Sequence, residues 1–278
     1  MKLLKIAAFS DGCVGGNPAG IALCETLPAA AEMQRIAADI GFSETAFAAP
    51  IGDAWRVRYF SPESEVPFCG HATIALGSAL AMTKGNRVFE LKLNNAAISV
   101  EGHLSGNDLT AALQSPPTRS TTPERSQVIE ALQLFGLTVN DLDNAIPPGA
   151  VFAGADHLVF ALKSRSRLAA MDYDLKQGQR FMRTSGLVTI ALAYARNAQH
   201  FDVRNAFASG GVMEDPATGA AAAAFAGYLR DLDWPHAGVI DIVQGEDMGM
   251  RSLIHVEIPT TRGSSIRVSG QARIMKSF

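Results

Sequence analysis

Residues 214–228 read EDPATGAAAAAFAGY, an acidic pair and a proline followed by an almost uncharged run of small residues. Asp215 is predicted to cap a helix here, and Pro216 suits a first turn whose N–H groups have no intrahelical partner. The alanines from 220 to 224 have the highest helix propensity of any residue. Because such a helix has no face suited to water, the stretch predicts a helix enclosed by a sheet.

A similar stretch lies in the first half of the chain, where residues 68–80 read FCGHATIALGSAL. Aligning Ala72 and Thr73 with Ala217 and Thr218 shifts the sequence by 145 residues, about half of the 278-residue chain. A recurrence of this kind indicates duplication. We therefore expect two similar domains, each with a turn that leads into a small-residue helix.

Composition excludes several classes of function. The chain is 47% hydrophobic and 18% charged, with a net charge of −3 and no polybasic run, which disfavours nucleic acid and acidic membranes as partners. No apolar run approaches the ~18 residues of a membrane span, and the start of the chain resembles a first strand more than a signal peptide. Three cysteines, an odd number, argue against a disulfide framework and for a reducing cytoplasm. The six histidines are scattered without zinc spacing, so no metal site is expected.

Strand-like runs recur throughout the chain, and helices are fewer. Residues 29–40 and 123–135 read as amphipathic helices, each followed by a glycine. The proline-containing stretch 115–126 is the best candidate for a linker. Glycines between residues 11 and 20 resemble a phosphate loop but lack its spacing, which predicts a permissive turn instead. Many strands with few helices favour a mixed barrel or half-barrel over a doubly wound parallel sheet.

Three places could carry chemistry. The two predicted helix starts, at residues 69–72 and 215–219, each present N–H groups and a positive dipole end, which can hold a carboxylate or stabilise an enolate-type oxyanion in a shared cleft. The third is Glu44, a lone acid among apolar residues in GFSETAF (41–47), which suits proton transfer. The alternative for Glu44 is an ion pair with Arg56 or Arg58.

An ordered set of motifs resembles the phenazine-biosynthesis PhzF-like isomerase family, which is related to diaminopimelate epimerase. The set comprises GNPAG, GFSETAF, ESEVPFCGHAT, EDPATGAA and IRVSGQARI, and it runs from residue 16 to 274. The resemblance implies an α+β fold of two pseudo-symmetric domains, each a curled, mostly antiparallel sheet wrapped around a central helix. The expected domains are residues 1–117, joined by the C-terminal strand 268–278, and residues 118–267. The resemblance also implies an active site between the domains, no cofactor, and a homodimer.

Residue roles follow from the matched motifs. Glu44 matches the family's proton donor and acceptor, while His71 and Asp215 match residues that orient substrate and assist the proton relay. Gly70 and Gly219 match backbone positions that hold the ligand.

Two positions differ from the relatives. Ala220 stands where the family often has serine, so a hydroxyl is lost from the substrate site while the backbone N–H remains. Cys69 occupies the place of one of two catalytic cysteines in the epimerases, but the second helix has no cysteine. Racemisation by two thiols is therefore disfavoured, and Cys69 is expected to line the substrate site as a small wall residue.

The resulting hypothesis is a cofactor-independent isomerase that shifts a proton and a double bond on a small carboxylated metabolite, with Glu44 as acid and base. Three alternatives stay open. One is an amino-acid racemase or epimerase that uses Cys69, another is a metabolite-binding protein without activity, and the last is a thiol hydrolase built on Cys69 and His71. The hydrolase is disfavoured because residues two apart on a turn rarely form a nucleophile–base pair.

Overall fold

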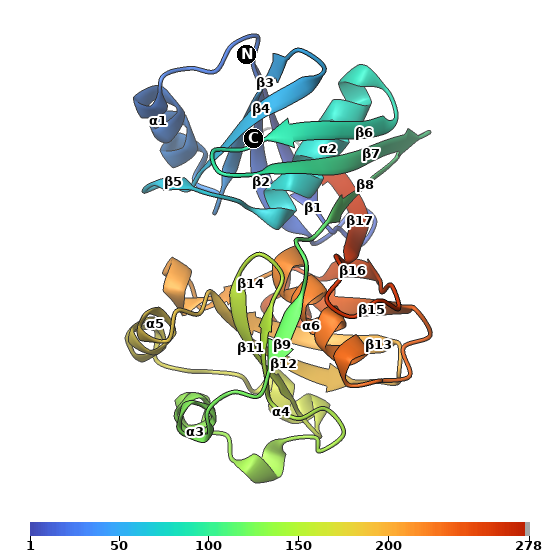
Figure 1. Ribbon diagram of the computed structural model, residues 1–278. Coiled ribbons are helices and arrows are strands. Elements are labelled where there is room, and N and C mark those ends of the chain that lie inside the picture. The colour runs from blue at the N-terminus through green and yellow to red at the C-terminus, as the bar shows by residue number, and fades with distance from the viewer. Residues whose placement is uncertain (276–278) are drawn as a thin grey trace. The chain divides into compact units, whose positions relative to one another are not determined.

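The structure is a computed structural model that describes residues 1–275. The chain divides into two compact units. Unit 1 is Met1–Gln114 together with the C-terminal stretch from Ser269, and unit 2 is Ser115–Val268. Within residues 1–275, no helix has the length and apolar character needed to cross a membrane. Figure 1 shows the strands and helices of each unit.

Unit 1 is a ring of strands around one helix. Neighbouring strands pair antiparallel except for β2 with β3 and β4 with β6, which are parallel. The last strand pairs with both β1 and β8 and so closes the ring. The strands are β1 (Lys2–Ala8), β2 (Asn17–Leu23), β3 (Thr45–Ile51), β4 (Ala54–Phe60), β5 (Glu65–Val66), β6 (Arg87–Lys92), β7 (Ala97–Ser105), β8 (Asp108–Gln114) and β17 (Arg267–Ile274).

The helix inside this ring is α2 (Gly70–Lys84), which is buried on every side from His71 to Ala81. It packs against strands on all sides, β1, β2, β3, β6, β7 and β8 among them. The closest approach joins Gly77 to Gly102 on β7, where a Cβ added to Gly102 would lie 2.1 Å from the Gly77 carbonyl oxygen. Helix and strand backbones therefore touch without a side chain between them, which explains the small residues of this stretch.

A second helix covers the outside of unit 1. Helix α1 (Ala30–Ile40) ends at Gly41 in the left-handed conformation and buries Met33, Ile36 and Ala37. These residues pack with Phe47 and other apolar residues of a small cluster. The helix predicted over residues 29–40 is confirmed.

Most strand pairings of unit 2 follow the same succession as in unit 1. Its strands are β9 (Arg119–Thr121), β10 (Gly149–Phe152), β11 (Asp156–Ala161), β12 (Thr189–Ala195), β13 (His200–Ala206), β14 (Glu214–Asp215), β15 (Val239–Gln244) and β16 (Ser252–Glu257). Pairs β11–β12 and β13–β15 are parallel, as are β2–β3 and β4–β6 in unit 1, and the other pairs are antiparallel.

The buried helix of unit 2 is α6 (Gly219–Asp231), which packs against β9, β10, β11 and β16. Helices α3 (Arg125–Leu134), α4 (Arg165–Ala169) and α5 (Leu175–Thr184) contribute to a separate apolar cluster. The helix predicted over residues 123–135 is confirmed as α3. The linker predicted over 115–126 is wrong from residue 119 onward, because β9 pairs there with β10 and α3 begins at Arg125.

Two local predictions at α6 are wrong. Thr218, not Asp215, precedes the helix as its N-cap, and Pro216 lies before the first turn. Asp215 belongs instead to β14, where it pairs with Asn205 on β13. Strand pairing therefore overrides the local preference of Asp for a cap, because it satisfies the backbone of this segment first.

The alignment of the two halves is also out of register. Two-residue strands begin at Glu65 and Glu214, and N-caps stand at Cys69 and Thr218, so equivalent positions lie 149 residues apart rather than 145. The two segments then share the pattern Glu-x-Pro-x-x-Gly, which leads from a short strand into a buried helix.

Candidate active site

Glu44 lies immediately before β3, in the connection from α1. Its backbone carbonyl accepts a hydrogen bond from Gly20 N–H at 3.1 Å, which ties the start of β3 to β2. Its side chain is only 13% exposed. The alternative ion pairs are wrong, because Arg58 binds Glu65 and Arg56 binds Asn94 and the Lys92 carbonyl.

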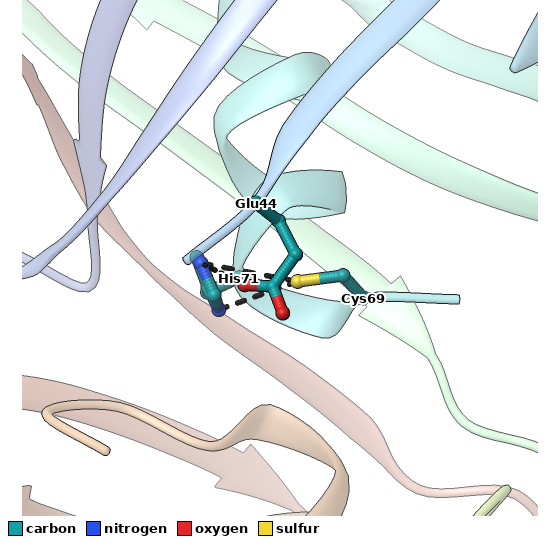
Figure 2. A group of neighbouring side chains, drawn as sticks. All are labelled: Glu44, Cys69 and His71. Atoms are coloured by element: carbon teal, nitrogen blue, oxygen red, sulfur yellow. Dashed lines mark hydrogen bonds and ion pairs between the residues drawn. The ribbon is translucent and has the colours of Figure 1, made fainter. Parts of the chain in front are cut away.

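The start of α2 places Cys69 and His71 beside Glu44 (Figure 2). Oε2 of Glu44 lies 3.3 Å from Nε2 of His71, and Sγ of Cys69 lies 3.4 Å from Nδ1 of the same ring. The hydroxyl of Ser43 is 3.4 Å from His71 Nε2. Oε2 of Glu44 is buried and takes no hydrogen bond from residues 1–275, although the His71 ring lies beside it. A carboxylate, an imidazole and a thiol thus lie together in one partly buried site.

A buried chain of hydrogen bonds holds the start of α2. The Thr73 hydroxyl donates to the Cys69 carbonyl at 2.6 Å, which leaves its oxygen to accept from the Tyr59 hydroxyl at 2.7 Å. Burial raises the pKa of Tyr59, so this hydroxyl keeps its proton and serves as the donor. Residues from β4 and α2 therefore fix the turn that carries Cys69 and His71.

In unit 2, Asp215 and the start of α6 form a second polar group. The Thr218 hydroxyl donates to Oδ2 of Asp215, and Gln244 on β15 donates to the Asp215 carbonyl at 2.7 Å. The amide oxygen of Gln244 also accepts from the Thr218 N–H at 3.3 Å. Gly219 and Ala220 are the first residues of α6. The first hydrogen bond of the helix runs from Ala222 N–H to the Thr218 carbonyl at 3.0 Å, so the N–H groups of Gly219 and Ala220 precede it.

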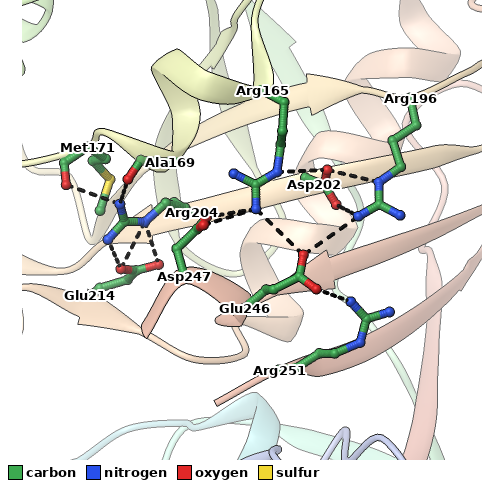
Figure 3. A network of polar contacts seen from close by, with 10 residues as sticks. All are labelled: Arg165, Ala169, Met171, Arg196, Asp202, Arg204, Glu214, Glu246, Asp247 and Arg251. Carbon is green, nitrogen blue, oxygen red and sulfur yellow. Dashed lines mark hydrogen bonds and ion pairs between the residues drawn. The ribbon is translucent and has the colours of Figure 1, made fainter. Parts of the chain in front are cut away.

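Both short strands are held by an arginine. In unit 2, Nη2 of Arg204 lies 2.6 Å from Oε2 of Glu214, and its Nη1 donates to the carbonyls of Ala169 and Met171 (Figure 3). In unit 1, Arg58 binds Glu65 through two hydrogen bonds, and these lower the pKa of the Glu65 carboxyl. Each glutamate opens the short strand that precedes a buried helix.

A neighbouring network in unit 2 surrounds the buried carboxylate of Asp202. Arg165 approaches it at 3.0 Å and Arg196 at 2.6 Å, and both arginines extend to Glu246 (Figure 3). This carboxylate is therefore compensated by cations, as buried charges must be. It belongs to the framework of unit 2 and carries no site residue.

The site residues expected from the sequence thus fall into two groups. Glu44, Cys69, Gly70 and His71 meet in unit 1, and Asp215, Gly219 and Ala220 lie around the start of α6 in unit 2. Five further polar residues hold these groups in place and are not among the predicted site residues: Ser43, Tyr59, Thr73, Thr218 and Gln244. Ser43 and Thr73 stand inside the quoted motifs, whereas Tyr59 and Gln244 lie in ordinary strand sequence and carry no local signal.

Comparison with known proteins decides the family. Residues 6–277 match the model of the family described as phenazine biosynthesis-like protein. The chain belongs to this family. The motif resemblance is therefore confirmed.

Two curated relatives are each 30% identical to the chain. One is an uncharacterized isomerase of Deinococcus radiodurans, which covers 98% of this chain and 92% of its own. The other is the trans-2,3-dihydro-3-hydroxyanthranilate isomerase of Pseudomonas aeruginosa. The match covers 97% of this chain and 95% of the relative. The enzyme class predicted for this chain, isomerase, is confirmed.

Solved structures show the same fold. A Bacillus anthracis phenazine biosynthesis protein of the PhzF family superposes with a TM-score of 0.85 at 23% identity, over 100% of this chain and 99% of the other. A probable proline racemase from Agrobacterium radiobacter superposes with a TM-score of 0.65 at 10% identity. The superposition covers 98% of this chain and 90% of the racemase. The predicted likeness to racemase and epimerase folds is confirmed at this level.

Proposed function

We propose that the protein is a cofactor-independent isomerase in which Glu44 moves a proton, and with it a double bond, on a small carboxylated metabolite. One observation carries this proposal. The Glu44 carboxylate is almost enclosed, lies 3.3 Å from His71 at the start of a buried helix, and has an oxygen that accepts no hydrogen bond from residues 1–275. A base placed in this way has an open lone pair for a substrate proton.

The proposed reaction needs only atoms of the substrate and Glu44. Glu44 removes a proton from one carbon, the electrons of that C–H bond shift the double bond by one position, and the protonated Glu44 returns the proton to a second carbon. Nothing is oxidised or reduced. His71 orients the carboxylate, and the first N–H groups of α2 stabilise negative charge that develops on the substrate.

Asp215 and the start of α6 supply the second part of the proposed mechanism. The N–H groups of Gly219 and Ala220 bind the substrate carboxylate, and Asp215 orients the substrate or relays a proton. Support comes from the shared Glu-x-Pro-x-x-Gly pattern, which we attribute to an internal duplication that produced two pseudo-symmetric domains. We predict that the two helix starts act on one substrate in a common cleft. The homodimer implied by the resemblance is likewise a prediction.

The substrate class is proposed from the family. The Pseudomonas aeruginosa relative is named for trans-2,3-dihydro-3-hydroxyanthranilate, an unsaturated ring acid with an amine and a hydroxyl. Ala220 has no hydroxyl to offer such polar groups, so we propose that the physiological substrate is an unsaturated carboxylate with fewer hydrogen-bonding groups near this position. The relative's substrate is nonetheless the first compound to test.

The deciding experiment measures deuterium uptake from D₂O into a panel of unsaturated amino and hydroxy acids. Glu44→Gln should abolish uptake and keep the fold, because an amide cannot cycle a proton, and loss of ~10²–10⁴-fold is typical for an acid–base group. Glu25→Gln, at an exposed position of the same unit, is the matched control. Uptake at the wild-type rate in Glu44→Gln would refute the mechanism. A protein that binds panel members without exchange would be a binding protein instead.

A thiol racemase is the second candidate, and the contact of Cys69 with His71 favours it. Under the glutamate mechanism Cys69→Ala keeps activity within about tenfold of wild type. A loss of ~10³-fold, together with inversion at a single carbon rather than migration between carbons, would identify Cys69 as the base.

A further inference from the structure

The donor atoms of Glu44, Cys69 and His71 form a group with the composition of a metal site. One carboxylate oxygen, one thiol sulfur and one ring nitrogen lie within 4.8 Å of one another (Figure 2). Among residues 1–275 this is the only such group of three. We propose that it binds a divalent cation of the zinc class, and that the bound cation inhibits the isomerase. The inhibition rests on the proposed function, and the binding does not.

The separations between these atoms fit one tetrahedral ion. Zn–S bonds of about 2.3 Å and Zn–N or Zn–O bonds of about 2.0–2.1 Å give tetrahedral edges of about 3.3–3.6 Å between ligand atoms. Nε2 of His71 lies 3.3 Å from Oε2 of Glu44 and 3.8 Å from Sγ of Cys69. The carboxylate oxygen of Glu44 and Sγ of Cys69 lie within 4.8 Å of each other. Two edges therefore already match a tetrahedral ion to within a few tenths of an ångström, and rotation of the Glu44 and Cys69 side chains would close the third.

The chemistry of the donors selects the ion. A thiolate and an imidazole favour zinc, cobalt and related ions over magnesium and calcium, which prefer sets of oxygen ligands. Thiolate and carboxylate together carry two negative charges, which balance a divalent ion in a partly buried place. Oε2 of Glu44, which is buried without a hydrogen bond, would gain a partner. Three protein ligands leave a fourth position for water.

Binding of this ion and catalysis exclude each other. The oxygen that holds the metal is the oxygen that would take the substrate proton, and the same ion would fix the His71 ring. A bound cation therefore inhibits, and substrate and metal lower each other's affinity by the same factor. This differs from a cofactor, because a chelator would preserve or raise the activity.

The test is a titration of the chelator-treated full-length protein with Co²⁺, a spectroscopic substitute for zinc. We expect one equivalent to bind, with visible bands of a tetrahedral ion and a near-ultraviolet charge-transfer band from the thiolate. Cys69→Ser should remove the charge-transfer band, and His71→Ala should weaken binding by ~100-fold or more, since loss of even an outer-shell partner costs 10–100-fold. Added Zn²⁺ should displace Co²⁺.

Cys24→Ala is the matched control. Cys24 is also a buried cysteine of unit 1, and burial raises the pKa of its thiol, which keeps it protonated and a poor ligand. This variant should bind Co²⁺ with an unchanged spectrum. Absence of the charge-transfer band in the wild type, or its persistence in Cys69→Ser, would overturn the assignment of the site.

Inhibition is measured separately, by deuterium exchange at increasing Zn²⁺ with and without excess chelator. Competitive loss of exchange that the chelator reverses supports the proposal, whereas full activity with one equivalent of metal bound overturns the inhibitory role. The titration needs no substrate. A protein that binds Co²⁺ but exchanges no panel member therefore counts against the proposed function alone.

Discussion

His157 provides a quantitative test of how burial acts in unit 2. It lies on β11, is 1% exposed, and its Nδ1 is 2.7 Å from the Thr189 hydroxyl on the neighbouring strand β12. Its Nε2 is buried and has no hydrogen-bond partner within residues 1–275. Because burial disfavours the charged ring, the pKa of His157 falls from its ordinary 6.5 to about 4.

The sign of the resulting pH dependence follows from proton binding. Between pH 6.5 and 4 the unfolded chain binds a proton at His157 and the folded chain does not, so acidification in this window stabilises the unfolded state. The contribution of the neutral ring is fully present above pH 6.5 and is lost progressively down to pH 4. The whole loss is about 3 kcal/mol, and about 2 kcal/mol of it has occurred at pH 5.

The assay compares the wild type with His157→Gln, which keeps a neutral hydrogen-bonding side chain. Urea unfolding is followed at pH 7.5 and at pH 5 by tryptophan fluorescence, to which Trp234 contributes the signal of unit 2 and Trp55 that of unit 1. Other titrating groups affect both proteins equally, so the wild type should lose about 2 kcal/mol more than the variant. Equal losses would show that His157 binds its proton in the folded state as readily as in the unfolded state, and the argument from burial would be wrong.

Three further substitutions test the framework and the site. Gly102→Ala forces a Cβ against the Gly77 carbonyl and should cost at least ~1–3 kcal/mol of unfolding free energy, seen as a lower Tm; an unchanged Tm would mean that α2 can move away freely. Arg204→Gln leaves Glu214 buried without its cation and should cost ~3–5 kcal/mol, whereas adding Glu214→Gln should recover part of the loss; a double-mutant cycle with no coupling would contradict this. Asp215→Asn should melt within a few degrees of wild type but lose most of its turnover, and normal turnover would reduce Asp215 to a structural role.

How far the sequence predicts this structure depends on whether the deciding interaction is local. The alanine run and Gly41 predict their helices correctly, because helix propensity and the left-handed end of α1 act within a few residues. The cap at α6 is predicted wrongly, because pairing of β14 with β13 involves residues that local reasoning cannot place. The contacts of Gln244 are unpredictable for the same reason, because this residue reaches Asp215 and Thr218 from β15.

In the candidate site, too, local features are predictable from the sequence and contacts between distant residues are not. The motif around Glu44 singles out the acid, but only the fold shows that its neighbour is His71 and not an arginine. The pattern Glu-x-Pro-x-x-Gly gives the correct register between the halves, whereas the more conspicuous Ala-Thr pairs lie four residues away from it.

The contact of Gly77 with Gly102 has a consequence for how such an enzyme can change during evolution. Because α2 rests on β7 backbone against backbone, a larger residue on either side would lift the helix, and with it the turn that carries Cys69 and His71. Variants that acquire a new substrate must therefore exchange side chains at the start of the helix and keep the contact between Gly77 and Gly102. Among related enzymes, substitutions are expected to accumulate around the start of the helix. Substitutions at the two glycines are expected to be rare, because they would displace the helix.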